Sequence, residues 1–420
     1  MSDTSKQSES EAPGVPKAAT QGAQAQGRDW SWVEACVWNE RMLAALDNGV
    51  TGGKWFSLID KVYRPATLQA AWRKVAANAG AAGVDRQSVE QCAVRAEVYL
   101  GELEAALKAG RYEPLAVLRV EIPKGPGKVR PLGIPAVKDR IVQTAVKLVL
   151  EPIFEREFLE TSYGFRPGRG CKHALRDDHN NAGLLELSDG RLLQLIEAFL
   201  HQDIVKGMQR WTPTGGTPQG AVISPLLANL YLHPLDCAMR ESGYQMVRYA
   251  DDFVVLCHTA EEARAGLAEV QAWMQANGLT LNLDKTHVGD CREEGQGFDF
   301  LGYRFEAGQR WVRRKSLTAI RDRIRAKTGR TRGDSLACII AELNPMLQGW
   351  YGYFQHAHPW TFSGMDGFVR RRLRSLRRKQ QKRPGTGRTL ADHHRWPNAF
   401  FAELGLFTMT EAHALASRPR

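Results

Sequence analysis

The chain has 420 residues, 43% of them hydrophobic, which is enough for two or three domains with cores of their own. Its net charge of +11 favours a polyanionic partner, and no apolar run approaches the roughly 20 residues of a membrane span. Seven scattered cysteines without a CxxC pair argue against a zinc site or a disulfide framework, so we expect a protein of the reducing cytoplasm.

Residues 1–27 are rich in Ser, Gln, Ala, Gly and Pro and contain no apolar segment, which predicts a disordered tail and not a secretory signal. Helical spacing follows as far as Gly110, and then the period changes. Residues 115–122 predict a strand, 123–130 a basic turn and 131–135 the return strand. Helices are expected at 30–46, 57–77, 86–109, 139–154, 190–200, 224–239 and 260–277, and further strands at 280–283 and 298–305.

Two adjacent carboxylates, Asp251 and Asp252, interrupt the apolar run MVRYADDFVVLC at 246–257. Branched apolar residues on both sides favour two strands, and a short polar break between them favours a hairpin. Two like charges side by side resist ionising unless a cation offsets them, and hard divalent cations such as Mg²⁺ prefer carboxylate oxygens. The pattern therefore indicates either a metal site or an acidic turn in contact with solvent, and the pair alone does not decide between them.

From Arg310 onward the sequence is predicted to be helical, and it is basic and aromatic. The aromatic segment NPMLQGWYGYF at 344–354 lies between two stretches rich in arginine. Basic helices that flank aromatic residues are typical of nucleic-acid binding, because cations contact phosphates and aromatic rings stack on bases. The alternative is a helical bundle whose aromatic residues only form its core. We expect both features, an aromatic core and a basic exterior.

Six segments, taken in order, resemble the block series of group II intron reverse transcriptases, and a seventh resembles their maturase domain. The resemblance covers nearly everything from Trp32 onward. The six segments are IPKGPGKVRPLGIPAVKDRIVQ, YGFRPGRGCKHAL, WTPTGGTPQGAVISPLLANLYLHPLD, RYADDFVVLC, LTLNLDKT and FDFLGYRF, and the seventh is about 316–396 with LNPMLQGWYGYF.

The resemblance implies an α+β right-hand polymerase with fingers, an antiparallel palm sheet and an α-helical maturase (thumb) domain. It implies RNA-directed DNA synthesis, intron RNA binding, help in splicing and support of retrohoming. The implied partners are intron RNA, a DNA target or primer and deoxynucleoside triphosphates, with a homodimer left open. The implied location is a bacterial-type cytoplasm, with nucleoid association on target DNA. The expected domains are a tail over 1–27, a helical extension over 28–115, fingers and palm over 116–310, the maturase domain over 311–396 and a C-terminal tail over 397–420.

The resemblance also implies roles for individual residues. Asp251 and Asp252 match two of the family's three carboxylates, which hold two Mg²⁺ ions. Three further positions match residues that contact the incoming triphosphate or the nascent base pair, and a fourth matches a palm lysine near the pyrophosphate. In that order they are Lys124, Arg130, Gln219 and Lys285.

Two larger sets of residues are matched as well. One set corresponds to the turn that holds the primer end, and it consists of Phe300, Leu301, Gly302 and Tyr303. The other is expected to contact RNA phosphates through guanidinium groups, and it consists of Arg313, Arg314, Arg371, Arg372, Arg377 and Arg378.

One block of the family has no match. After FRPGRGCKHAL the family places a strand with the first catalytic Asp, in the style D-I-K-G-[FY]-F-D, whereas residues 177–190 (DDHNNAGLLELSDG) are rich in turn-forming residues. The segment 203–208 (DIVKGM) begins with Asp but lies too close to TPQG to be followed by the family's helix and connections. We therefore expect a chain shortened internally around 177–190, without the third metal ligand.

Three hypotheses remain open. In the first, the chain is an active polymerase and maturase whose third acid is Asp177, Asp178 or Asp203. In the second, it is a maturase that binds folded intron RNA and catalyses nothing. In the third, it is a decayed element that folds poorly.

Overall fold

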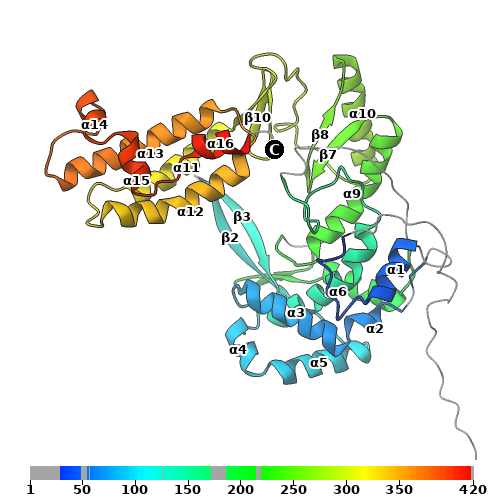
Figure 1. The fold of residues 1–420 in the computed structure, drawn as a ribbon. Helices are drawn as coiled ribbons and strands as arrows, with labels where there is room; N and C mark the ends of the chain where they lie inside the picture. Colours follow the sequence, from blue (N-terminus) through cyan, green and yellow to red (C-terminus); the bar gives the residue numbers. More distant parts are fainter. Residues whose placement is uncertain are drawn as a thin grey trace, which may run out of the picture. The chain divides into compact units, whose positions relative to one another are not determined.

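The computed structural model describes residues 29–48, 54–55, 57–125, 127–171, 186–213 and 219–417. It is an α+β structure in which most elements are helices and the strands form small sheets (Figure 1). The chain divides into two compact units. Unit 1 contains the residues up to Ser242 and also Val247–Asp251, and unit 2 contains Gly243–Met246 and the residues from Asp252 onward.

The first three predicted helices of unit 1 begin later or are more divided than the apolar spacing predicts, whereas α6, α8 and α9 lie within two residues of their predicted bounds. The helix expected at 30–46 begins only at Glu40, because 30–39 form turns. The stretch 57–77 is interrupted at Arg64, whose extended backbone (ψ 135°) is the conformation that a following proline imposes. The helices are α1 (Glu40–Asn48), α2 (Ile59–Val62), α3 (Pro65–Asn78), α4 (Val89–Val94), α5 (Ala96–Lys108), α6 (Val137–Glu155), α8 (Gly190–Leu200) and α9 (Ser224–Glu241).

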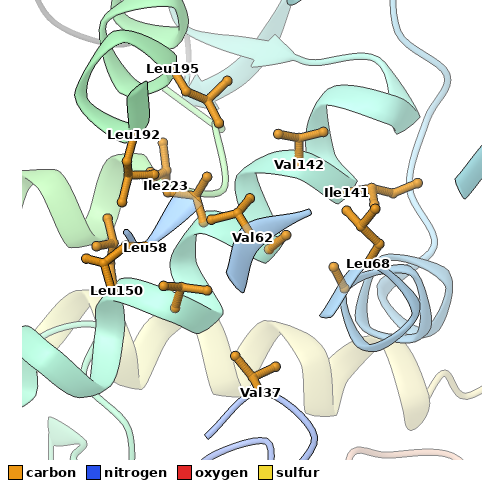
Figure 2. Packing of buried hydrophobic residues seen from close by; sticks show 14 of the residues in the cluster. Val37, Leu58, Val62, Leu68, Ile141, Val142, Leu150, Leu192, Leu195 and Ile223 are labelled. Carbon is orange, nitrogen blue, oxygen red and sulfur yellow. The ribbon is translucent and has the colours of Figure 1, made fainter. Parts of the chain in front are cut away.

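Helix α6 lies at the centre of the unit 1 core. Helices α2 and α3 pack against it, and its apolar side chains are buried on most sides. Figure 2 shows Leu150 of α6 close to Leu58, with Leu192 of α8 and Ile223 beside them. All four side chains are buried almost completely, so each contributes roughly 1.5–3 kcal/mol of hydrophobic stabilisation.

A proline inside α6 is matched by a distant tryptophan. Pro152 has no backbone N–H, so it cannot donate to the carbonyl of Leu148 one turn earlier. The indole Nε1 of Trp38 donates to that carbonyl at 3.1 Å, and Trp38 is 1% exposed. The segment before α1 is thereby attached to the middle of α6.

A four-stranded sheet in the order β3-β2-β5-β6 extends from this helical core. Its first hairpin consists of β2 (Val117–Gly125) and β3 (Lys128–Ile134), which confirms the predicted pair of strands. Both strands extend about three residues further toward the turn than predicted. Strand β5 (Ile204–Lys206) runs parallel to β2, with Val117 opposite Ile204, and turns back into β6 (Gln209–Trp211). This second hairpin was not predicted, because its strands are only three residues long.

A buried carboxylate connects this sheet to α6. Asp139 is fully buried, and it accepts one hydrogen bond from the Tyr112 hydroxyl at 2.5 Å and another from the Leu115 backbone N–H at 3.0 Å. Burial raises the pKa of Asp139 to about 6, and the two hydrogen bonds oppose this shift. The folded state therefore retains this proton at pH values where the unfolded chain has released it.

We predict that replacing Asp139 with Asn removes a pH dependence of stability. Because the folded pKa of Asp139 is raised, its contribution to the free energy of unfolding is complete below pH 4 and is lost as the pH rises to about 6. The change is at most about 3 kcal/mol. Urea unfolding followed by tryptophan fluorescence from pH 4 to 7 measures it for both proteins. A constant difference between wild type and Asp139→Asn over this range would contradict the prediction.

The predicted hairpin around Asp251 and Asp252 is confirmed. Strands β7 (Gln245–Tyr249) and β8 (Asp252–Leu256) form a two-stranded sheet. Another short pair, β1 (Lys54–Trp55) with β4 (Glu186–Leu187), is parallel. The candidate acids Asp177 and Asp178 lie outside the described residues.

Unit 2 begins with β8 and α10 (Ala260–Ala276) and continues into a three-stranded antiparallel sheet and a set of helices. The strand expected at 280–283 is wrong: these residues include the start of a turn in which Asn282 O accepts from the N–H groups of Lys285 and Thr286. The sheet consists of β9 (Phe298–Phe300), β10 (Tyr303–Glu306) and β11 (Gln309–Val312). The helices are α11 (Arg314–Lys327), α12 (Leu336–Phe354), α13 (Trp360–Gln380), α14 (Leu390–Arg395), α15 (Asn398–Glu403) and α16 (Met409–Ala416).

The end of the chain belongs to the unit 2 core. We expected a C-terminal tail over 397–420, but α15 and α16 lie there, and Phe401 and Met409 are completely buried. Asp366 of α13 accepts hydrogen bonds from the backbone N–H groups of Met409 and Thr410, which fixes the start of α16. Among the residues that the structure describes, none of the helices combines the length and apolar character that a membrane span requires.

Candidate functional site

The turn between β7 and β8 presents two carboxylates to solvent. Asp251 and Asp252 are both exposed. The residue before them, Ala250, has φ +57°, in the left-handed region that a residue with a Cβ rarely adopts. Such a conformation persists where surrounding contacts hold it, and residues of this kind are frequent at functional sites.

Within the described part of the chain, no three His, Cys, Asp or Glu side chains gather closely enough to hold a metal ion. Asp203, one of the three acids considered as a third ligand, already uses both carboxylate oxygens. Its Oδ2 accepts from Arg210 Nε at 2.6 Å and its Oδ1 from the Thr212 hydroxyl at 2.5 Å. These bonds lower the pKa of Asp203, with the Thr212 bond as the largest cause, and they bring together the two ends of the β5–β6 hairpin.

Two of the predicted nucleotide-contacting residues lie together in unit 1. Arg130 Nε of β3 donates to Gln219 Oε1 at 3.0 Å, and both side chains are exposed. The Gln219 backbone carbonyl accepts from the Gly133 N–H at 2.6 Å. Gly220 has φ +115°, and a Cβ at this position would lie 2.4 Å from the Gly133 carbonyl oxygen, so only glycine allows this approach. Lys124, also exposed, lies further along β2 toward the hairpin tip.

The turn expected to hold a primer lies in unit 2 between β9 and β10. Leu301 (φ +48°) and Gly302 (φ +82°) form it, which divides the single strand expected at 298–305. The hydroxyl of Tyr353 donates to the Leu301 carbonyl at 2.9 Å, and the hydroxyl of Tyr303 donates to the Tyr353 carbonyl at 2.8 Å. The turn is therefore attached to the aromatic end of α12.

The remaining predicted residues of this turn are mostly buried. Phe300 is 7% exposed and Tyr303 is completely buried, so these two side chains contribute to packing within unit 2.

Lys285 is exposed in the turn that replaces the expected strand. Arg314 is exposed at the first position of α11, and Arg313, half-buried before it, lies 3.9 Å from Asp299.

A group of arginines on α11 and α13 surrounds one phenylalanine, and we call it the arginine cluster. The guanidinium carbons of three arginines lie 5.2–5.8 Å from the ring centroid of Phe368. Burial lowers the pKa of Arg371, and so does the positive charge of the other members. Like charges this close repel, and a polyanion would relieve the repulsion. The members of the cluster are Arg321, Arg325 and Arg371.

The other arginines predicted on α13 make contacts within the chain. Arg372 donates to the hydroxyl and the carbonyl of Thr328, at 3.0 and 2.7 Å. Arg378 pairs with the buried Asp392 and donates to the Pro384 carbonyl at 2.6 Å. Arg377 makes a long contact of 3.4 Å with Gln380. Of the four arginines predicted on α13, Arg371 alone belongs to the arginine cluster.

Comparison with known proteins connects these features. A family described as "Reverse transcriptase (RNA-dependent DNA polymerase)" matches residues 186–305, and "Group II intron, maturase-specific domain" matches residues 317–396. The group II intron-encoded protein LtrA of Lactococcus lactis subsp. cremoris is 39% identical over 158 residues, 31% of this chain and 26% of LtrA. Protein YkfC of Escherichia coli (strain K12) is 32% identical over 315 residues, 59% of this chain and 82% of YkfC. The chain belongs to the group II intron reverse transcriptase family.

The chain spans about a quarter of LtrA but most of YkfC. A solved structure titled "Partial Cas6-RT-Cas1--Cas2 complex" aligns with 55% of this chain and 43% of its own, at 22% identity and a TM-score of 0.29.

The donor atoms at the carboxylate turn fit Mg²⁺ in kind. They are carboxylate oxygens on two adjacent exposed residues, Asp251 and Asp252, and hard oxygen donors are what Mg²⁺ prefers. In number they are fewer than the three carboxylates of the family pattern.

The arginine cluster could not be predicted as a unit from the sequence. The i, i+4 spacing of Arg321 and Arg325 on one helix face is a signal for part of it, but nothing in the sequence connects them to Phe368.

Proposed function

We propose that this protein binds intron RNA. We also propose that unit 1 and the hairpin of β7 and β8 provide the framework of an RNA-directed DNA polymerase. In this proposal, 116–310 act as fingers and palm and 311–396 as the thumb. The observation that carries it is the turn of Asp251 and Asp252, exposed on a hairpin within the span that matches the reverse transcriptase family. Bound Mg²⁺ would activate a primer hydroxyl and offset the charge of the leaving pyrophosphate.

The contact between Arg130 and Gln219 supports the nucleotide-binding part of this proposal. An exposed guanidinium can form two parallel hydrogen bonds to a phosphate, and Gln219 Oε1 aims it from the side. The backbone hydrogen bond from the Gly133 N–H to the Gln219 carbonyl holds Gln219 beside β3, the strand that carries Arg130. In this proposal Arg130 orients the triphosphate, and Gln219 would contact the nascent base pair.

The arginine cluster and the maturase match support RNA binding by unit 2. Phosphates would replace the repulsion among like charges with attraction, and the release of condensed counterions would add affinity. We propose further that the bound RNA is a group II intron, and that the protein assists splicing of this intron and supports its retrohoming to a DNA target.

A second candidate function is RNA binding without catalysis. The sequence observation that favours it is that no segment between Arg176 and Thr212 matches the family's block D-I-K-G-[FY]-F-D, which carries the first catalytic carboxylate. In this case the carboxylate turn would be a remnant, and splicing assistance would rest on the binding surfaces alone.

We predict that the double substitution Asp251→Ala with Asp252→Ala separates the two roles. RNA affinity should stay within about twofold of wild type, because metal ligands contribute little to the affinity for a phosphate backbone. Any template-dependent primer extension should fall to the level measured without protein. Filter binding of a labelled group II intron transcript and extension of oligo(dT) on poly(rA) with Mg²⁺ measure the two quantities.

The paired substitution Glu293→Ala with Glu294→Ala, two adjacent exposed acids, controls for the loss of negative charge. Loss of RNA binding in a well-folded double variant at 251 and 252 would contradict the division of roles.

A further inference from the structure

Arg248, three residues before Asp251, is completely buried, and all five of its N–H groups are used. Nε and Nη2 form a bidentate pair with Asp236 at 2.7 and 2.5 Å, and Nη2 also donates to the Ser162 hydroxyl at 2.8 Å. Nη1 donates to Asn229 Oδ1 at 2.9 Å and to the Ala250 carbonyl at 3.0 Å. The last of these bonds reaches the backbone of the carboxylate turn.

The partners of Arg248 come from parts of unit 1 that are far apart in sequence. Asn229 and Asp236 lie seven residues apart on α9, which puts them on one face of the helix. Ser162 belongs to a segment whose backbone pairs with β7: the Arg248 N–H donates to the Thr161 carbonyl and the Tyr163 N–H to the Arg248 carbonyl, both at 2.9 Å.

A close backbone approach supports the turn as well. A Cβ on Gly164 would lie 2.1 Å from the Ala250 backbone N, so glycine is required there. Asn229 Nδ2 donates to the Gly164 carbonyl at 2.7 Å. The same amide side chain therefore binds Gly164 and Arg248, and both of these residues contact Ala250.

A second buried arginine in unit 1 provides a comparison. Arg166 forms a bidentate pair with Glu155 and donates to the carbonyls of Leu159 and Ser162, but none of its hydrogen bonds involves residues 249–252. If a buried ion pair served only the stability of this unit, the two arginines would be equivalent. They differ in the bond from Arg248 to the Ala250 carbonyl, whose residue has the left-handed conformation.

We propose that Arg248 is a positioning residue for the carboxylate turn: held by Asp236, Asn229 and Ser162, it fixes the Ala250 carbonyl and thereby aims the carboxylates that follow at one divalent cation. This inference rests on the proposed function in taking Asp251 and Asp252 as metal ligands. Outer residues that orient metal ligands commonly change metal affinity by 10–100-fold when they are lost.

Mn²⁺ binding to the full chain tests the proposal, with unbound Mn²⁺ measured by electron paramagnetic resonance. The difference between wild type and the Asp251→Ala/Asp252→Ala variant defines the binding at this turn. Replacing both members of the buried pair, as Arg248→Met with Asp236→Leu, leaves no unpaired charge, and such exchanges are often neutral for stability. Arg248→Lys is the second variant, because it keeps the charge but cannot reproduce five N–H donors in a planar fork. Arg166→Met with Glu155→Leu is the matched control.

We expect both Arg248 variants to weaken Mn²⁺ binding at the turn about 10-fold or more, and the Arg166 control to leave it unchanged whatever its thermal stability. Unchanged Mn²⁺ affinity in either folded Arg248 variant would overturn the proposal. An equal loss of affinity in the Arg166 control would also overturn it, because the effect would then follow general stability. If wild type and the Asp251→Ala/Asp252→Ala variant bind Mn²⁺ alike, the metal role of the turn fails together with this inference, while RNA binding, measured separately, still decides the rest of the proposed function.

Discussion

We expect the unmodified chain to extend an oligo(dT) primer on poly(rA) at no more than background level in Mg²⁺, even when it binds RNA well. Between Arg176 and Thr212 no segment of the sequence matches the family's block with its first catalytic Asp, and Asp203 uses both carboxylate oxygens within its own hairpin. A cation held by Asp251 and Asp252 without a third carboxylate would be poorly positioned. Positioning provides most of the catalysis in phosphoryl transfer.

Insertion of the missing segment from an active relative at the junction near Asp178 should raise primer extension by about 100-fold or more. The control is the same insertion with its catalytic Asp replaced by Ala, which should restore the length of the chain but not its activity. Strong DNA synthesis by the unmodified chain, abolished by substitution of Asp177, Asp178 or Asp203, would refute this expectation and identify the third acid.

The arginine cluster should account for much of the salt dependence of RNA binding. We expect Arg321→Gln, Arg325→Gln and Arg371→Gln together to weaken binding and to reduce the slope of log affinity against log salt concentration by roughly 2 to 3, because each lost phosphate contact removes about 0.7–0.9. Filter binding of a labelled single-stranded RNA over a series of KCl concentrations measures this slope.

The control for the arginine cluster removes three positive charges elsewhere, at Arg240, Arg264 and Arg292, which are exposed and lie outside the cluster. It should change the slope by much less. An unchanged slope in the cluster variant would mean that these arginines face solvent in the complex. Arg372 and Arg378 are poor choices for this test, because their contacts with Thr328 and Asp392 hold unit 2 together and their loss would confound binding with folding.

The sequence predicted those helices and strands whose limits are marked by local features, such as a capping residue or an apolar run. Helix α8 has the predicted bounds, because Asp189 caps its N-terminus by accepting from the N–H groups of Arg191 and Leu192. The hairpin of β7 and β8 follows from its two apolar runs. The strand expected around Leu283 failed because its alternating leucines have no partner strand in the described structure, and Leu283 is 71% exposed.

Contacts between distant segments could not be predicted. The role of Arg248 depends on residues from positions 162, 229 and 236, and no local pattern indicates that they meet. The same holds for Asp203, whose family-like sequence context gives no hint that Arg210 and Thr212 occupy its carboxylate. The resemblance identified which residues have counterparts in the family, and the structure identified which of them are already engaged within the chain.

The parallel pairing of β2 with β5 bears on how such a gene can shorten without losing its product. Any missing block belongs to the long connection between these two strands, so its loss removes neither of them. The residues between these strands, 126–203, include β3, α6 and α8, and the buried side chains of α6 and α8 belong to the unit 1 core of the chain as it stands. A deletion confined to the other residues of this connection leaves these core elements in place. An element could lose its copying chemistry in one step and still supply a stable RNA-binding protein to its host.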